Sequence, residues 1–146
     1  MLEDRQVSCI FCSIVQKDEP ASIVYEDDQI LAFLDIAPIN PGHTLVIPKV
    51  HYESLSEVPN SVVARMMTVA KKIANAIRLS RVYCEGINLL LADGEAAFQD
   101  VFHCHLHVVP RFKGDSFRID GCYSNHPERS ELDRVALQIR SNMESV

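Results

Sequence analysis

The sequence predicts an α+β fold, in which a sheet of about five mostly antiparallel strands packs against one long helix and a second helix follows near the C-terminus. Short apolar runs separated by turn residues fill the first third of the chain. One long stretch then has helical periodicity, and two further apolar runs come after it. The chain has 146 residues, the length of one domain, so we expect a single domain over 1–146.

The first three strands are expected at 23–25, 29–34 and 43–47. A polar turn separates the first two runs, and the third ends at Pro48. Such short connections join antiparallel neighbours, so these runs predict a meander.

The long helix is expected over 60–79, with Asn60 as a suitable N-cap after Pro59. Its apolar residues recur at steps of three and four, which predicts one buried face. These residues are Val63, Met66, Met67, Ala70, Ile73, Ala74 and Ile77.

Two more strands are expected at 87–92 and 101–109, and a last helix begins near Ser130. The apolar residues of this helix again follow a helical period. They are Leu132, Val135, Ala136 and Ile139.

Composition excludes some classes of function and leaves others open. The formal net charge is −6 without any basic block, which argues against a broad nucleic-acid surface but not against a small phosphorylated ligand. No signal-like segment opens the chain, and no apolar run approaches the ~20 residues of a membrane span. We therefore expect a cytoplasmic protein that binds no membrane.

Five cysteines, an odd number, argue against a disulfide framework in such a chain. Two of them form the motif Cys9-Ile10-Phe11-Cys12. In a cytosolic protein this spacing indicates a metal site or a redox pair.

Three histidines alternate with apolar residues in the run His103-Cys104-His105-Leu106-His107. In a strand they would share one face at intervals of about 6.5–7 Å. Three imidazoles gain nothing for packing, so a functional role is expected. They either bind a catalytic metal, or one neutral imidazole attacks phosphorus and forms a covalent nucleotidyl-histidine.

The surroundings of this run resemble the histidine triad (HIT) family. The family signature has three histidines at alternating positions, preceded by a glutamine, and three more segments match it in order. Together the matches cover roughly residues 9 to 111. The segments are Cys9-Ile10-Phe11-Cys12, Phe33 to Pro38, Pro41 to His51, and Gln99 to Arg111.

The resemblance implies a role for each matching polar residue. His105 is the expected nucleophile, and His107 is expected to contact the phosphate. Gln99 stands where the family places a side chain near the phosphate and the bridging oxygen. His43 matches a buried histidine that supports the triad, and Asp35 matches a carboxylate that binds the ribose hydroxyls.

The resemblance also implies a base pocket. Phe33 and Ile36 flank Asp35 as candidate walls, and Phe11 and Ile23 are further candidates. Each of these apolar residues could equally belong to the core.

In the zinc-carrying branch of the family, Cys9, Cys12, His51 and His103 match the ligands of a structural zinc. Two thiolates and two imidazoles complete a tetrahedral shell without an open position. The alternative is a pair of reduced, partly buried thiols. If His103 binds zinc, His105 and His107 are too few for a catalytic metal.

Three positions depart from the family pattern. Phe98 replaces a common glycine, Ala92 replaces an asparagine, and Asp100 stands where some members have serine. Aspartate is a poorer donor, and it would repel phosphate if its side chain pointed into the site.

The resemblance therefore implies a hydrolase acting at the α-phosphorus of nucleotides through a nucleotidyl-His105 intermediate, with release of a nucleoside monophosphate. A phosphorylase or nucleotidyl transferase, and a non-catalytic nucleotide-binding module, are the alternatives. Purine nucleotides and a homodimer are further expectations from the family.

Overall fold

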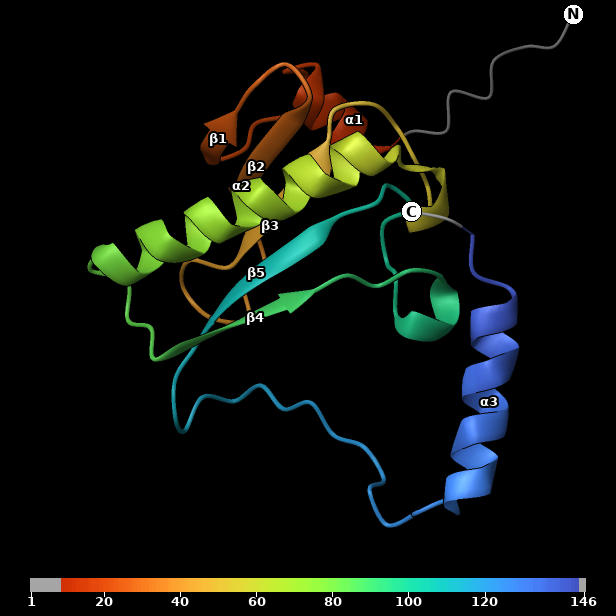
Figure 1. Cartoon of the computed structure of the whole chain (residues 1–146). Coiled ribbons are helices and arrows are strands. Elements are labelled where there is room, and N and C mark those ends of the chain that lie inside the picture. Colours follow the sequence, from red (N-terminus) through yellow and green to blue (C-terminus); the bar gives the residue numbers. More distant parts are fainter. Residues whose placement is uncertain (1–8, 145–146) are drawn as a thin grey trace, which may run out of the picture. The chain divides into compact units, whose positions relative to one another are not determined.

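A computed structural model describes residues 9–144 and divides the chain into two units, the first ending at Ser116 and the second beginning at Phe117. The first unit contains one five-stranded sheet with the strand order β1-β2-β3-β5-β4 (Figure 1). Every pair of neighbouring strands is antiparallel, which confirms the α+β fold. The strands are β1 (Ile23–Glu26), β2 (Ile30–Leu34), β3 (Thr44–Pro48), β4 (Gly86–Leu90) and β5 (Leu106–Arg111).

The long helix α2 (Asn60–Leu79) lies where its apolar period predicts. Pro59 is its N-cap and Asn60 its first helical residue, so the cap lies one position earlier than the sequence predicted. The buried face of α2 joins side chains of the sheet in one core cluster. That cluster includes Met66, Val69, Ala70, Ile73 and Ile77 from α2, and Ile30, Ala32, Val46, Leu106 and Val108 from the strands.

A short helix, α1 (Ile10–Val15), covers the other face of β2 and β3. Successive strand residues point to opposite faces, and residues that alternate with those under α2 form a second cluster with α1. The central strands are therefore buried on both faces. The second cluster consists of Phe11, Ile14, Leu31, Phe33, Leu45 and Ile47.

Helix α1 was not predicted, because six residues are too few to display a helical period. Cys9 is its N-cap, and the Cys9 Sγ accepts the backbone N–H of Cys12 at 3.4 Å. The motif that suggested a metal or redox pair thus also forms the start of a helix.

The turn between β2 and β3 needs a glycine. Gly42 has a φ of +92°, and a Cβ there would lie 2.9 Å from the Cγ1 of Val82. This turn brings the end of β2 next to His43, which directly precedes β3.

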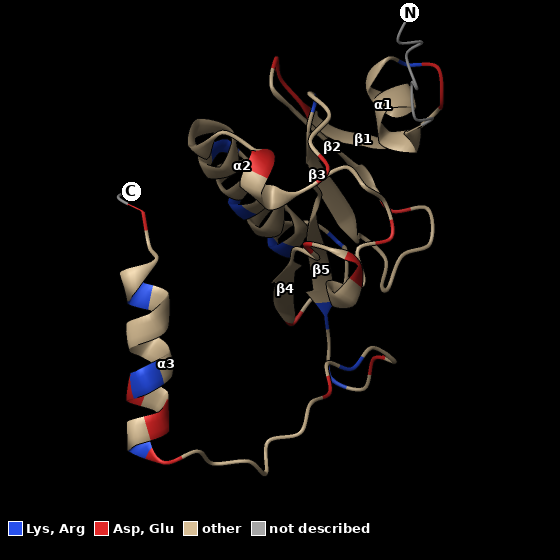
Figure 2. Ribbon diagram, turned by 90° about the vertical axis from the view of Figure 1, so that its right-hand side faces the viewer, with Lys and Arg blue, Asp and Glu red and all other residues tan. Residues whose placement is uncertain are grey.

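The second unit contains helix α3 (Arg129–Ser141). Its predicted apolar residues follow the expected period, yet they are exposed, with Ile139 at 61%. Acidic and basic segments both occur along α3 (Figure 2). Glu131 pairs with Arg134 at 2.6 Å. A single domain over 1–146 stays a prediction. Among residues 9–144, no helix is long and apolar enough to cross a bilayer.

Candidate functional site

His103 lies in a bend before β5, which begins at Leu106 rather than near Val101 as predicted. Its ring is fully buried, and Nε2 lies 2.8 Å from the carbonyl oxygen of Pro48. A carbonyl can only accept, so Nε2 carries the proton and Nδ1 keeps its lone pair. Burial lowers the pKa of His103 to about 4, so the ring is neutral at pH 7.

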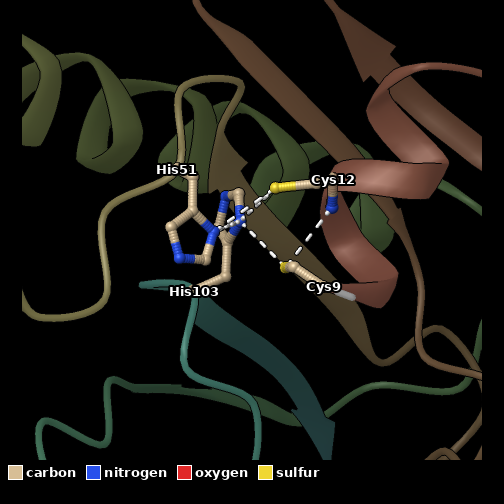
Figure 3. A group of neighbouring side chains, drawn as sticks. All are labelled: Cys9, Cys12, His51 and His103. Atoms are coloured by element: carbon tan, nitrogen blue, oxygen red, sulfur yellow. Dashed lines mark hydrogen bonds between the residues drawn. The ribbon is translucent and has the colours of Figure 1, made fainter. Parts of the chain in front are cut away.

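That lone pair points into a cluster formed by Cys9, Cys12, His51 and His103 (Figure 3). The Nδ1 of His103 lies 3.5 Å from the Cys9 Sγ, 3.6 Å from the Cys12 Sγ and 3.2 Å from the His51 Nδ1. The Cys12 Sγ lies 3.3 Å from the His51 Nδ1. The structure therefore brings together all four residues that the sequence selected as metal ligands.

These separations fit the edges of a tetrahedron around one metal ion. Ligand bonds of zinc length give sulfur–nitrogen edges of about 3.6 Å and a nitrogen–nitrogen edge of about 3.3 Å. Burial and the neighbouring Cys9 raise the pKa of Cys12 to about 11, so a thiolate here needs a cation beside it. The donor set and its geometry both fit a metal ion.

His105 presents the opposite ring nitrogen. Its Nδ1 lies 2.7 Å from the carbonyl oxygen of His103, so Nδ1 donates and Nε2 keeps the lone pair. The ring of Phe11 packs edge-on against His105 with centroids 5.2 Å apart. This contact and the hydrogen bond hold the ring in one orientation, which leaves Nε2 as its nucleophilic atom.

His43 and His107 form a relay with fixed tautomers. The backbone N–H of Ile39 donates to the His43 Nδ1 at 3.1 Å, so the proton of neutral His43 is on Nε2. That Nε2 lies 2.9 Å from the Nδ1 of His107, which must accept. Neutral His107 therefore carries its proton on Nε2, free to donate to a ligand.

Both histidines are neutral at pH 7. Burial lowers the pKa of His43, and burial together with His105 and His43 lowers the pKa of His107 to about 4. The rings of His105 and His107 lie 4.9 Å apart. A ring with a lone pair on Nε2 and a ring with an N–H on Nε2 are thus neighbours.

Two carboxylates flank this group. The Asp35 Oδ2 lies 3.6 Å from the Nε2 of His43, while its Oδ1 accepts the N–H of Ala37 at 2.9 Å. The Asp100 Oδ1 lies 3.6 Å from the Nε2 of His105. Asp35 was a predicted site residue, whereas Asp100 was noted only as a departure from the family pattern.

Gln99 is buried, and its amide holds the loop before the histidines. Its Oε1 accepts the N–H of Gly94 at 2.8 Å. Its Nε2 donates to the carbonyls of Glu53 at 2.7 Å and Val101 at 3.1 Å. Both amide hydrogens are thus used by the backbone, and a contact with phosphate stays a prediction.

The candidate base-pocket residues are not alike. Phe33 and Phe11 are buried and pack edge-on with centroids 5.4 Å apart, whereas Ile36 is completely exposed and Ile23 is 43% exposed. Ile36 follows Asp35 directly, and its exposed side chain is open to a ligand there.

Sequence reasoning missed the partners that fix the ring protons. They are the carbonyls of Pro48 and His103 and the N–H of Ile39. Backbone groups leave no signal in residue identity, so no sequence pattern could reveal them.

A fold with this histidine relay defines a HIT domain, and the family model for that domain matches residues 16–114. The chain therefore belongs to the HIT family. It is 46% identical over 136 residues to a HIT-like protein of Borreliella burgdorferi. The aligned residues cover 92% of this chain and 98% of the relative.

Two more relatives have names that state an activity. The Arabidopsis thaliana protein named adenylylsulfatase HINT3 is 40% identical, over 93% of this chain and 68% of the relative. The Saccharomyces cerevisiae protein named adenosine 5′-monophosphoramidase HNT1 is 31% identical, over 94% of this chain and 84% of the relative. Both names describe hydrolases of nucleotides.

Solved structures agree with the fold. A HIT family protein from Bacillus anthracis has a TM-score of 0.86 at 40% identity, covering 94% of this chain and 98% of the other. A zinc-bound histidine triad family protein from Mycobacterium smegmatis has a TM-score of 0.72 at 45% identity, covering 94% of this chain and 99% of the other.

Proposed function

We propose that this protein hydrolyses nucleotides at the α-phosphorus through a covalent nucleotidyl-His105 intermediate and releases a nucleoside monophosphate. The observation that carries the proposal is the pair of fixed tautomers. The ring of His105, whose Nε2 keeps a lone pair, neighbours the ring of His107, whose Nε2 carries an N–H. A nucleophile and a donor for a phosphate oxygen are the two groups that this displacement needs.

In the first step the lone pair of His105 forms a nitrogen–phosphorus bond. The bond from phosphorus to the leaving atom breaks, and that atom takes the bonding electrons and a proton from water. In the second step a water oxygen attacks phosphorus, and the electrons of the phosphorus–nitrogen bond return to Nε2. One proton of this water passes to solvent. It balances the proton that the leaving atom took from water in the first step.

The remaining residues position these groups. His43 holds the tautomer of His107, and Gln99 holds the loop from Gly94 to Val101. Asp35 is the candidate acceptor for ribose hydroxyls, and Ile36 is the candidate wall for the base. The names of the relatives support adenosine nucleotides as the first to test.

The four-residue cluster is proposed to hold a structural zinc ion. Two thiolates and two imidazoles close its shell, so the ion would join α1 to the segment before β5 and would not activate water. The Mycobacterium smegmatis relative is a zinc-bound protein, which supports this choice of metal.

The test is the replacement His105→Gly, with His126→Gly as the control because His126 is exposed and lies outside the first unit. With an adenosine phosphoramidate as substrate, we expect turnover to fall by a factor of about 10⁴ or more, since the nucleophile is lost. Calorimetry should show nucleotide binding within about threefold of the parent protein, because the donors of the site remain.

Mass spectrometry of the quenched parent protein should find a nucleotidyl group on His105. Full activity of the His105→Gly protein would contradict the mechanism. Binding without turnover in the parent protein would indicate a non-catalytic module. A product that incorporates added phosphate would indicate a phosphorylase.

A further inference from the structure

Asp100 is a carboxylate at the open side of the nucleophile. Its Oδ1 lies 3.6 Å from the Nε2 of His105, although 80% of its side chain is exposed. The same oxygen accepts the N–H of Val101 at 2.9 Å, which holds the carboxylate in this place. A fixed negative charge therefore faces whatever binds beside His105.

The other charges around the relay do not neutralise it. The titratable groups that shift the pKa of His107 are His105, His43, Asp35 and Asp100. The permanent charges in this set are the two carboxylates. Asp35 is placed at the end of β2 beside His43, which leaves Asp100 as the charge nearest the nucleophilic atom.

The leaving group of the displacement must come close to this charge. In an in-line attack, the leaving atom lies about 4 Å from Nε2 in the transition state. Added to the separation of 3.6 Å between Nε2 and Asp100, this places the leaving atom within about 8 Å of the carboxylate. That distance is no longer than the Debye length at physiological salt, so a charge on the leaving group interacts with Asp100.

From this geometry, and resting on the proposed function, we infer that Asp100 selects the leaving group by its charge. The preferred substrates are nucleoside phosphoramidates whose leaving amine carries a positively charged group. Substrates with anionic leaving groups, such as sulfate, phosphate or a carboxylate-bearing amine, react more slowly. The names of the two relatives mention a sulfate and a phosphoramide nitrogen, and the charge of Asp100 disfavours the sulfate.

Asp100 also repels the α-phosphate, and this repulsion is the same for every substrate. It therefore cancels when two substrates are compared in one protein. The ratio of kcat/KM between substrates is the quantity that isolates an effect on the leaving group.

Three adenosine 5′-phosphoramidates serve as probes, with the leaving amines 1,2-diaminoethane, propylamine and β-alanine. They share the phosphorus–nitrogen bond and differ in the charge of a tail of similar length. Each is measured with the full chain and with Asp100→Asn, which keeps an oxygen that can accept the N–H of Val101. The intrinsic reactivity of each amine cancels between the two proteins.

A unit charge about 8 Å away in a mostly aqueous site changes the rate by about threefold. The cationic and anionic substrates differ by two charges, so Asp100→Asn should lower the ratio of cationic to anionic kcat/KM by about tenfold. Asp100→Lys should lower it further, and raising the salt from about 0.02 M to about 0.5 M should shrink the parent ratio toward that of Asp100→Asn.

Asp28→Asn is the matched control. It removes one acidic charge in the exposed turn before β2, at the opposite end of that strand from Asp35. Its ratio should stay within twofold of the parent ratio. An equal fall in this control would mean that net charge, and not Asp100, sets the preference, and would overturn the inference.

The two proposals fail in different ways. If the parent protein cleaves all three substrates and Asp100→Asn leaves their ratio unchanged, the inference about Asp100 is wrong and the hydrolase stands. If the parent protein releases no nucleotide from any of them, the proposed function is wrong and the inference is lost with it.

Discussion

His103 and His105 lie two residues apart on one backbone segment, yet they present opposite ring nitrogens. The Nδ1 of His103 faces the cysteines, whereas the Nε2 of His105 faces Asp100 and its ring neighbours that of His107. In each ring the other nitrogen donates to a backbone carbonyl, of Pro48 in one case and of His103 itself in the other. The difference shows that backbone acceptors, and not the side-chain type, assign each histidine to its site.

The largest expected effect is on kcat, and it comes from a substitution that disrupts the relay and leaves the cluster intact. His107→Ala removes the donor beside the nucleophile, and we expect kcat to fall by about 10³. His51→Ala is the matched change in the cluster and should cost less than about tenfold in kcat, because His51 touches no relay residue in the described structure. Steady-state kinetics of both variants on an adenosine phosphoramidate checks this. Equal losses would mean that the two groups form one site.

The second largest effect is on stability, and it comes from changes that disrupt the cluster and leave the relay intact. Cys12→Ser, or removal of the metal by a chelator, should lower the free energy of unfolding by about 2 kcal/mol and Tm by about 10 °C. The reason is that α1 then loses its ligand link to the segment before β5. Differential scanning calorimetry and metal analysis measure the change.

Cys122→Ser is the control for that experiment, since Cys122 is exposed and lies in the second unit. It should leave both Tm and the metal content unchanged. A metal content of zero in the parent protein would contradict the zinc proposal.

The smallest expected effect is the pH dependence of the free energy of unfolding that His107 causes. The pKa of His107 falls from 6.5 to about 4 in the folded state, so between these values the unfolded chain binds more protons. Stability therefore decreases as pH falls through this window and levels off below it. From pH 7 to pH 5 we expect a loss of about 1 kcal/mol from His107, less than the full shift implies because the ring is partly exposed.

Urea unfolding at the two pH values measures this loss. In His107→Gln the pH dependence should become shallower by the same amount. An unchanged slope would show that other groups cause it.

The sequence predicted the fold well wherever a period or a turn was long enough to read. The 20 residues of α2 lie where their apolar spacing placed them, and the first three strands differ from their predicted bounds by one residue. The six-residue α1 carries no readable period. The bend at His103 was also missed, because alternating histidines look the same in a strand and before one.

The members of the candidate site could be selected from the sequence, but their geometry could not. All four cluster residues and the relay of His43, His105 and His107 come together. Which nitrogen of each ring carries a proton depends on backbone groups. The direction of Asp100 depends on its bond to the N–H of Val101, which no residue pattern encodes.

The contact between Cys9 and His103 also dictates an order of assembly, because it closes a span of 94 residues. Helix α1 can pack on β2 and β3 early, but its contact with His103 must wait for the segment before β5, and the chain entropy of so long a loop delays that contact further. Phe11 lies in α1, so its packing against His105 is completed only when this long span has closed.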